Sequence, residues 1–384
     1  MTSTAQTARR ILEQTLAHPV VSVFFDLDPE QFATAPARAS QLRSLLDEAD
    51  RTSRSDESLA HEDRKAVTEA LRRVESYLQS DEAPVSGARA LAVFCSGGDD
   101  LFEAVQLPRP TAPRVVIART PFVEPLVAGD AGDRWCVTLV SRDHGRIFEG
   151  EAPHLRGTGR VQDDVHGQHS QGGWSQANYE RSAENEAEQH FRHLAQELYH
   201  HWQRQPFSRL VLGGPEADVA RFAELLHNDL RPALATTRLS LDAETASPSD
   251  VQAAAATLVE SEREGAQAAA VAELAERAAA NRSAVLGLEN TLTALGERRV
   301  ETLVLARNFN ADGARCDTCG LLYPAGAATC PADGTELAAV PDLREAAIEA
   351  AVLQDAEVVV AGEGSETPPS VLVRGGGIGA LLRF

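Results

Sequence analysis

Residues 209–226 read RLVLGGPEADVARFAELL, and this stretch predicts a buried strand, a tight turn and an amphipathic helix. Its apolar run Leu210–Leu212 ends at Gly213-Gly214-Pro215, and the helix is expected to begin after the proline. The paired glycines resemble a phosphate-binding loop, but the third glycine and the lysine of such loops are missing. We interpret the stretch as a strand-to-helix connection of an α/β fold.

The same alternation of apolar runs and helical periods extends on both sides of this stretch. Strands are expected at Val20–Phe25, Ala90–Cys95, Arg114–Ala118, Trp135–Val140, Thr302–Ala306, Glu357–Ala361 and Ser370–Val373. Helices are expected within Arg43–Gln79 and at Asn178–Trp202, Glu216–Leu226, Ser249–Asn281, Gly287–Leu295 and Asp342–Gln354. The polar part of the first helical region, Arg51–Asp63, is either an exposed loop or the turn of a helix hairpin. A long glycine- and histidine-rich loop is expected from Ala152 to Gln176.

Length and charge limit the function classes. The 384 residues suffice for two or three domains, and 43% hydrophobic residues exclude general disorder. The 36 Lys+Arg against 57 Asp+Glu give a net charge of -21, which argues against non-specific coating of nucleic acid or an anionic membrane. A local basic patch that docks on RNA is still compatible with this charge. Lys65 is the only lysine, so Schiff-base and P-loop enzymes are nearly excluded.

Two further observations concern the cellular compartment. The sequence has no apolar run long enough for a signal peptide or a membrane span. The five cysteines are an odd number, and three of them lie close together in a metal-like pattern, so a disulfide framework is not expected. We therefore expect a cytoplasmic protein.

The cysteine pattern consists of Cys316-Asp-Thr-Cys319 and Cys330-Pro-Ala-Asp333-Gly. Two thiolates on a tight turn can hold one tetrahedral zinc ion, and a second knuckle normally completes such a site. Because the second knuckle has only one cysteine, Asp333 is the candidate fourth ligand. A structural zinc ion is one interpretation, and a ribbon that has lost its metal and is held by proline and glycine turns is the other.

A second motif is Gly172-Gly173-Trp174-Ser175-Gln176, at the end of the expected loop. Paired glycines let a backbone enter a narrow space, and a glutamine can hold a water molecule through its amide. From the residues alone, a flexible surface loop is the simpler interpretation. His190 and His193 follow on the expected helix, one turn apart, and solvent-facing side chains are the simpler interpretation of them too.

The C-terminal stretch GGIGALLRF, residues 376–384, resembles the closing strand of the archaeal and eukaryotic class-one release factors and of Pelota. Residues 287–305 are similar to the third domain of that superfamily, in which a cysteine ribbon also follows the first strand. Residues 21–29 and 121–126 resemble its first domain, and residues 135–148 and 209–215 its middle domain. The resemblance covers essentially the whole chain. It implies three α/β domains in tandem: 1–129, 130–265 with the Gly-Gly…Gln loop, and 266–384 with a small zinc-ribbon-like insert at 314–337.

Within this superfamily, the chain most resembles bacterial release-factor-like families, relatives of the Vms/ANKZF peptidyl-tRNA hydrolases and of Balon-type ribosome hibernation factors. Release factors carry Gly-Gly-Gln at the tip of the middle-domain loop. The resemblance implies that Gly172 and Gly173 extend toward the peptidyl-transferase centre and that Gln176 orients the attacking water. The insertion Trp174-Ser175 departs from the family pattern, and Gln171 and Gln168 are alternative glutamines.

Release factors read stop codons with an Asn-Ile-Lys-Ser loop, which should fall near Arg51–Lys65 but is missing there. Termination at stop codons is therefore not expected. The first remaining function is a ribosome-rescue enzyme that cleaves peptidyl-tRNA, by ester hydrolysis or by cutting the tRNA 3′ end. The second is a non-catalytic hibernation factor that binds the vacant A site. The retained glycines and glutamine favour the enzyme.

The resemblance also implies a set of partners. These are the ribosomal RNA of the A site and of the peptidyl-transferase centre, together with peptidyl-tRNA. A translational GTPase that delivers the factor is a further candidate. We expect a monomer that binds no membrane and whose only candidate cofactor is structural Zn²⁺.

Overall fold

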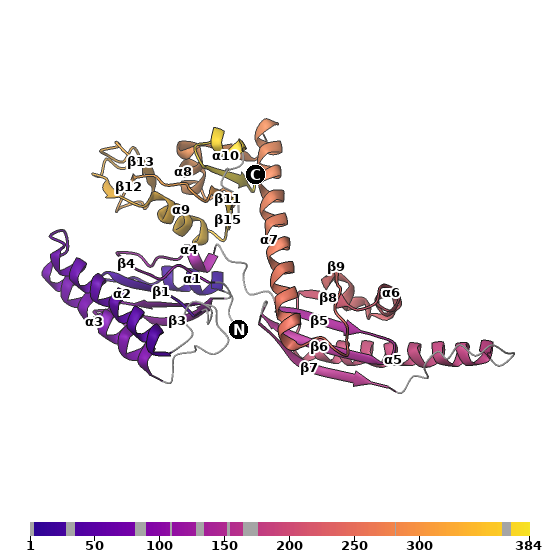
Figure 1. Ribbon diagram of the computed structural model, residues 1–384. Helices are drawn as coiled ribbons and strands as arrows, with labels where there is room; N and C mark the ends of the chain where they lie inside the picture. Colours follow the sequence, from indigo (N-terminus) through magenta and orange to yellow (C-terminus); the bar gives the residue numbers. More distant parts are fainter. Residues whose placement is uncertain are drawn as a thin grey trace. The chain divides into compact units, whose positions relative to one another are not determined.

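A computed structural model describes residues 4–27, 35–80, 90–107, 110–127, 134–151, 154–163, 176–280, 282–362 and 370–384. The chain forms two compact units, one made of residues 1–131 and 262–384 and the other of residues 132–261. Helices and strands are mixed along the whole described chain (Figure 1), which confirms the α/β fold class. The helices are α1 (Thr4–Leu12), α2 (Ala35–Ser55), α3 (His61–Gln79), α4 (Glu124–Val127), α5 (Gln176–Arg204), α6 (Glu216–Leu225), the 3-10 helix η1 (Asn228–Ala233), α7 (Pro248–Ala279), α8 (Leu288–Gly296), α9 (Leu343–Val352) and α10 (Ser370–Arg374).

The first sheet has the strand order β3-β2-β1-β4. Its strands are β1 (Val20–Asp26), β2 (Ala90–Cys95), β3 (Phe102–Leu107) and β4 (Arg114–Ala118). All seven residues of β1 are buried, because both faces of this strand are covered. Val21 and Val23 share a core with residues of α2 and α3, whereas Val20 and Phe24 belong to the core that α1 joins. Helices α2 and α3 form a hairpin, so the hairpin is the correct interpretation of the polar stretch Arg51–Asp63.

The sheet of the second unit has the order β7-β6-β5-β8-β9. Its strands are β5 (Arg134–Val140), β6 (His144–Glu151), β7 (His154–Gln162), β8 (Arg209–Gly213) and β9 (Leu234–Leu239). Residues of α5 and α6 form one core with this sheet, and the first half of α7 forms a second. The expected loop from Ala152 to Gln176 is wrong for its first part, where β7 pairs with β6. Only Leu155 and Val161 of β7 belong to the buried apolar core, so the strand has no apolar run to reveal it.

The remaining strands belong to the first unit. One sheet has the order β10-β16-β11-β15, and a small sheet has the order β13-β12-β14. Their strands are β10 (Ala284–Leu286), β11 (Val300–Ala306), β12 (Gly313–Arg315), β13 (Leu322–Pro324), β14 (Ala338–Val340), β15 (Glu357–Ala361) and β16 (Ile378–Leu382). The strand expected at Ser370–Val373 is wrong, because α10 occupies this segment. Its short apolar run fits a helix as well as a strand, and the place in the sheet is taken by β16.

Helix α9 joins the two chain segments of the first unit through buried charges. Arg344 is 8% exposed, and its Nη2 donates to Glu124 Oε1 over 2.6 Å, while its Nη1 donates to the carbonyl of Ala306 over 2.9 Å. The Glu345 carboxylate accepts from the backbone N–H of Val123. Burial raises the pKa of the Glu345 carboxyl well above its usual range. The contact between the segments therefore depends on one closely matched set of polar groups.

Arg344→Ala is expected to lower the free energy of unfolding by about 3–5 kcal/mol, because it leaves buried acceptors without their cation. Urea unfolding followed by circular dichroism measures this loss. Arg9→Ala is the matched control, since Arg9 pairs with Asp355 at the surface and its side chain is 38% exposed. The control should cost less than about 1 kcal/mol. Equal losses in the two variants would contradict a dominant role of the buried pair.

Among the helices that the structure describes, none combines the length and the apolar character needed to cross a membrane.

Candidate functional site

The residues predicted to act in the middle of the chain are only partly within the described structure. Gly172 and Gly173 lie outside the described residues. Gln176 is the first residue of α5, so the helix predicted after the motif is present. The described structure stops just after β7 and resumes at the start of α5. One face of α5 is buried, and this buried stripe consists of Ala183, Ala187, Phe191, Leu194 and Leu198. The stripe packs against β6 and β7 and fixes the helix on the sheet.

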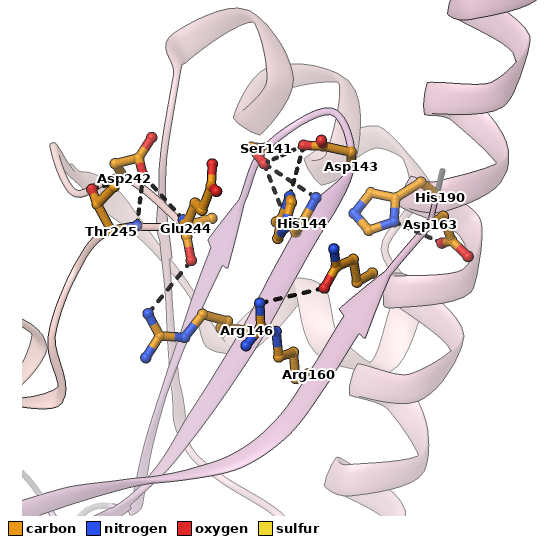
Figure 2. Close-up of polar contacts among 12 residues, drawn as sticks. Ser141, Asp143, His144, Arg146, Arg160, Asp163, His190, Asp242, Glu244 and Thr245 are labelled. Atoms are coloured by element: carbon orange, nitrogen blue, oxygen red, sulfur yellow. Dashed lines mark hydrogen bonds and ion pairs between the residues drawn. The ribbon is translucent and has the colours of Figure 1, made fainter. Parts of the chain in front are cut away.

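A buried histidine holds α5 to the end of β7. His190 is 1% exposed, and its Nδ1 lies 2.7 Å from Oδ2 of Asp163, the last described residue before the motif (Figure 2). His193, which is exposed, contacts the same oxygen at 3.3 Å. Partial burial acts to raise the pKa of Asp163, but the hydrogen bonds with the two histidines outweigh it and lower that pKa. The interpretation of the helix histidines as solvent-facing is therefore wrong for His190.

A second pair repeats the arrangement further along the helix. Nδ1 of His201 lies 2.9 Å from Oε2 of Glu149, which is 5% exposed on β6. Sequence reasoning missed both pairs, because the carboxylates come from strands whose register cannot be read from the helix. The two pairs position α5, and with it the place where Gln176 begins the helix.

Asp163→Ala is expected to lower the free energy of unfolding at pH 7 by about 1–3 kcal/mol, because a buried imidazole loses its partner. The Asp163 pKa is lower in the folded protein, so this contribution is present above the ordinary Asp pKa of about 3.9. It should vanish as the pH falls through the lowered folded-state value. Urea unfolding from pH 7 to pH 3 measures the difference, with Glu188→Ala on the exposed face of α5 as control. A difference that grows below pH 4 would contradict this account.

The four predicted metal ligands lie together in the connections between the strands of the small β12–β14 sheet. One donor atom from each of Cys316, Cys319, Cys330 and Asp333 lies within 4.8 Å of the others. The Sγ atoms of Cys319 and Cys330 are 3.6 Å apart, and Cys316 Sγ is 3.4 Å from Asp333 Oδ2. A tetrahedron with Zn–S bonds of about 2.3 Å has edges of about 3.8 Å. The four groups are therefore close enough to bind one metal ion.

The two knuckles have the same backbone geometry. The carbonyls of Cys316 and Cys330 accept from the N–H groups of Gly320 and Gly334, each over 2.8 Å. Both glycines have positive φ, 74° and 77°, which ends each knuckle in a conformation that favours glycine. Asp333 therefore occupies the position in the second knuckle that Cys319 occupies in the first. Its carboxylate accepts the N–H of Thr335 over 2.9 Å, and this bond helps to lower the pKa of Asp333 to about 2.

The surroundings of the thiols also bear on metal binding. The Tyr323 hydroxyl lies 3.3 Å from Cys330 Sγ, and this hydrogen bond lowers the pKa of the Cys330 thiol. An N–H from Leu321 acts to lower the pKa of Cys319, but desolvation and the neighbouring thiols raise it to about 11. A cation among these groups would favour the thiolate forms that zinc requires.

Comparison with known proteins finds a family resemblance for the middle of the chain. Residues 121–260 match the sequence profile of the family described as bacterial archaeo-eukaryotic release factor family 10. This middle region is release-factor-like. The resemblance stated from the sequence is thereby confirmed, and the matched residues include the Gly172-Gly173…Gln176 motif. No curated protein matches the chain.

Solved structures with similarity to this chain include proteins from archaea and yeast. The archaeal translation termination factor aRF1 is 16% identical, with 99% of this chain and 97% of that chain covered and a TM-score of 0.25. Pelota from Archaeoglobus fulgidus is 15% identical, with 77% and 79% covered and a TM-score of 0.36. Dom34 from S. cerevisiae, described as a translation termination-like factor that interacts with Hbs1, is 10% identical, with 77% and 79% covered and a TM-score of 0.38.

Proposed function

We propose that this protein is a ribosome-associated factor that cleaves peptidyl-tRNA independently of stop codons. The observation that carries the proposal is the match of residues 121–260 to a bacterial release-factor family, because these residues contain Gly172, Gly173 and Gln176. In the proposal, the glycines let the backbone enter the peptidyl-transferase centre, and the Gln176 amide positions the attacking water. The missing codon-reading loop near Arg51–Lys65 supports action without a stop codon.

The chain's own described residues have a positioning role in this mechanism. The pairs His190–Asp163 and His201–Glu149 hold α5 on the sheet, and α5 begins at Gln176. A fixed helix start reduces the freedom that the reacting groups would otherwise lose in the transition state. The division into domains at residues 129 and 265, a cytoplasmic location and delivery by a translational GTPase belong to the same proposal.

The first test asks whether the purified chain binds ribosomes and turns over peptidyl-tRNA. Co-sedimentation with purified ribosomes measures the binding. Release of labelled peptide from stalled complexes measures the turnover, and the length of the tRNA product separates ester hydrolysis from cutting of the tRNA 3′ end. We expect both binding and turnover. Tight binding to vacant ribosomes without turnover would instead support the hibernation factor, and no co-sedimentation would overturn both.

We also propose that Cys316, Cys319, Cys330 and Asp333 hold one structural Zn²⁺. The donor set of three sulfurs and one carboxylate suits zinc, and the separations fit a tetrahedral site. Bound zinc would link the two knuckles, which otherwise contribute only short strands to the fold. A catalytic zinc ion keeps one coordination position open for water or substrate, whereas here four protein ligands would fill all the positions. The zinc ion would therefore be structural.

A further inference from the structure

Two arginines lie directly opposite each other on neighbouring strands of the second unit. Arg146 on β6 is the register partner of Arg160 on β7. Figure 2 shows both side chains on the same face of the sheet, at its β7 edge. Like charges at directly opposite positions of an antiparallel pair destabilise the sheet. The arrangement therefore needs a compensating interaction.

The Arg146 guanidinium is held in place by neutral groups. Its Nη1 donates to the carbonyl oxygen of Ala246 over 2.5 Å, and its Cζ lies 4.8 Å from the centre of the Phe148 ring. These two contacts orient the guanidinium but bring no negative charge to it, and they leave its Nε and Nη2 without a hydrogen bond of their own. Arg160 is exposed, and among the described residues its side chain donates to the Gln162 amide oxygen over 3.4 Å. None of these contacts brings a negative charge to either arginine.

Two carboxylates drawn near the pair in Figure 2, those of Asp242 and Asp163, are engaged with other groups. Within the described parts of residues 132–261, neither arginine forms an ion pair with an acidic residue. Asp242, on the neighbouring turn in Figure 2, accepts from the N–H of Thr245 over 2.8 Å and from its hydroxyl over 2.9 Å. Asp163 is paired with His190. An uncompensated arginine pair in a chain of net charge -21 points to an anion from outside the protein.

The strand that carries Arg160 is open to an approaching ligand. β7 is an edge strand of its sheet, so part of its backbone N–H groups lack a neighbouring strand. Gly157 on this strand is exposed, and an added Cβ there would meet only the Phe148 ring, at 3.7 Å. Packing therefore does not require a glycine at this position. Because Gly157 has no side chain, the edge of β7 is accessible there.

We propose that Arg146 and Arg160 bind the phosphodiester backbone of RNA. A phosphate accepts paired hydrogen bonds from a guanidinium, and its charge would offset the repulsion between the two arginines. The choice of RNA over an acidic polypeptide rests on the proposed function, because RNA makes up the centre of the ribosome on which the factor would act. Double-stranded RNA is recognised mostly by its shape and through its phosphates and 2′-hydroxyls, which suits a pair of arginines.

The test compares Arg160→Gln and the double variant Arg146→Gln/Arg160→Gln with the wild-type chain. Arg192→Gln is the matched control, since it removes the same charge from an exposed arginine that is already paired with Glu188 at 2.5 Å. Affinity for purified large ribosomal subunits and for a labelled RNA hairpin is measured at several salt concentrations. We expect about tenfold weaker binding for Arg160→Gln and a salt slope reduced by about 0.9 per arginine. The control should bind within about twofold of wild type.

A measurement without RNA separates binding from folding. If the repulsion is real, Arg160→Gln raises the melting temperature at low salt, and the gain disappears in high salt because the charges are screened. Unchanged affinity and salt slope in a wild-type protein that does bind ribosomes would overturn this inference and leave the proposed function standing. If the RNA hairpin binds through the two arginines but the protein does not bind ribosomes, the inference stands and the proposed function is overturned. Competition by polyglutamate but not by RNA would overturn it in favour of an acidic protein partner.

Discussion

Gln176→Ala is expected to slow peptidyl-tRNA cleavage on stalled ribosomes about 100- to 1,000-fold, which is the usual effect of losing one positioned polar group at a reacting centre. Affinity for the ribosome should stay within about twofold, because one uncharged side chain is a small part of a large interface. Single-turnover rates at saturating factor separate the chemical step from binding. A matched loss of rate and affinity would point to a contact residue and contradict a role in orienting water.

The insertion of Trp174-Ser175 makes the neighbouring glutamines the natural controls. Gln171→Ala and Gln168→Ala remove the same amide from the same segment, and we expect them to retain rates within about threefold of wild type. Deletion of Trp174 and Ser175 restores Gly-Gly-Gln spacing. If Gln171→Ala, and not Gln176→Ala, abolished the rate, the assignment of Gln176 would be wrong although the enzyme would stand.

The fold could be predicted where one strand or helix carries its own signal. The strand at Val20 and the helix stripe through Phe191 were found as expected, because both faces of β1 and one face of α5 are buried and therefore apolar. β7 could not be found in this way. Its pairing with β6 supplies hydrogen bonds that no side-chain pattern records. The same holds for α10, whose short apolar run does not distinguish helix from strand.

In the candidate site, too, the sequence predicted what depends on local spacing and missed what depends on strand register. Cysteine spacing is local, so the sequence alone grouped Cys316, Cys319 and Cys330 with Asp333, and in the structure their donor atoms lie within 4.8 Å of one another. The partner of His190 is 27 residues away in the sequence, at the end of a strand that the sequence does not reveal. The opposition of Arg146 and Arg160 likewise depends on strand register, which no periodicity fixes.

Cys330→Ser is expected to abolish zinc binding and to unfold the small β12–β14 sheet, because two knuckles that share one ion lose their common centre. The wild-type chain should contain about one zinc ion per molecule by elemental analysis. The variant should contain none and should melt at a temperature several degrees lower. Asp317→Ala, within the first knuckle but outside the four-residue ligand group, is the matched control and should keep the metal.

Asp333→Cys decides between the two interpretations of the ribbon. Asp333 stands in the second knuckle where Cys319 stands in the first, so a cysteine there completes a set of four thiolates without a change in backbone. If the wild-type chain uses the carboxylate as its fourth ligand, both proteins bind zinc, and Asp333→Cys binds it at least about tenfold more tightly because thiolate is the softer ligand. If only Asp333→Cys binds zinc, the natural ribbon has lost its metal, and the prediction for Cys330→Ser fails with it. Zinc affinity measured by competition with a chromophoric chelator distinguishes these outcomes, because it compares the two proteins on one scale.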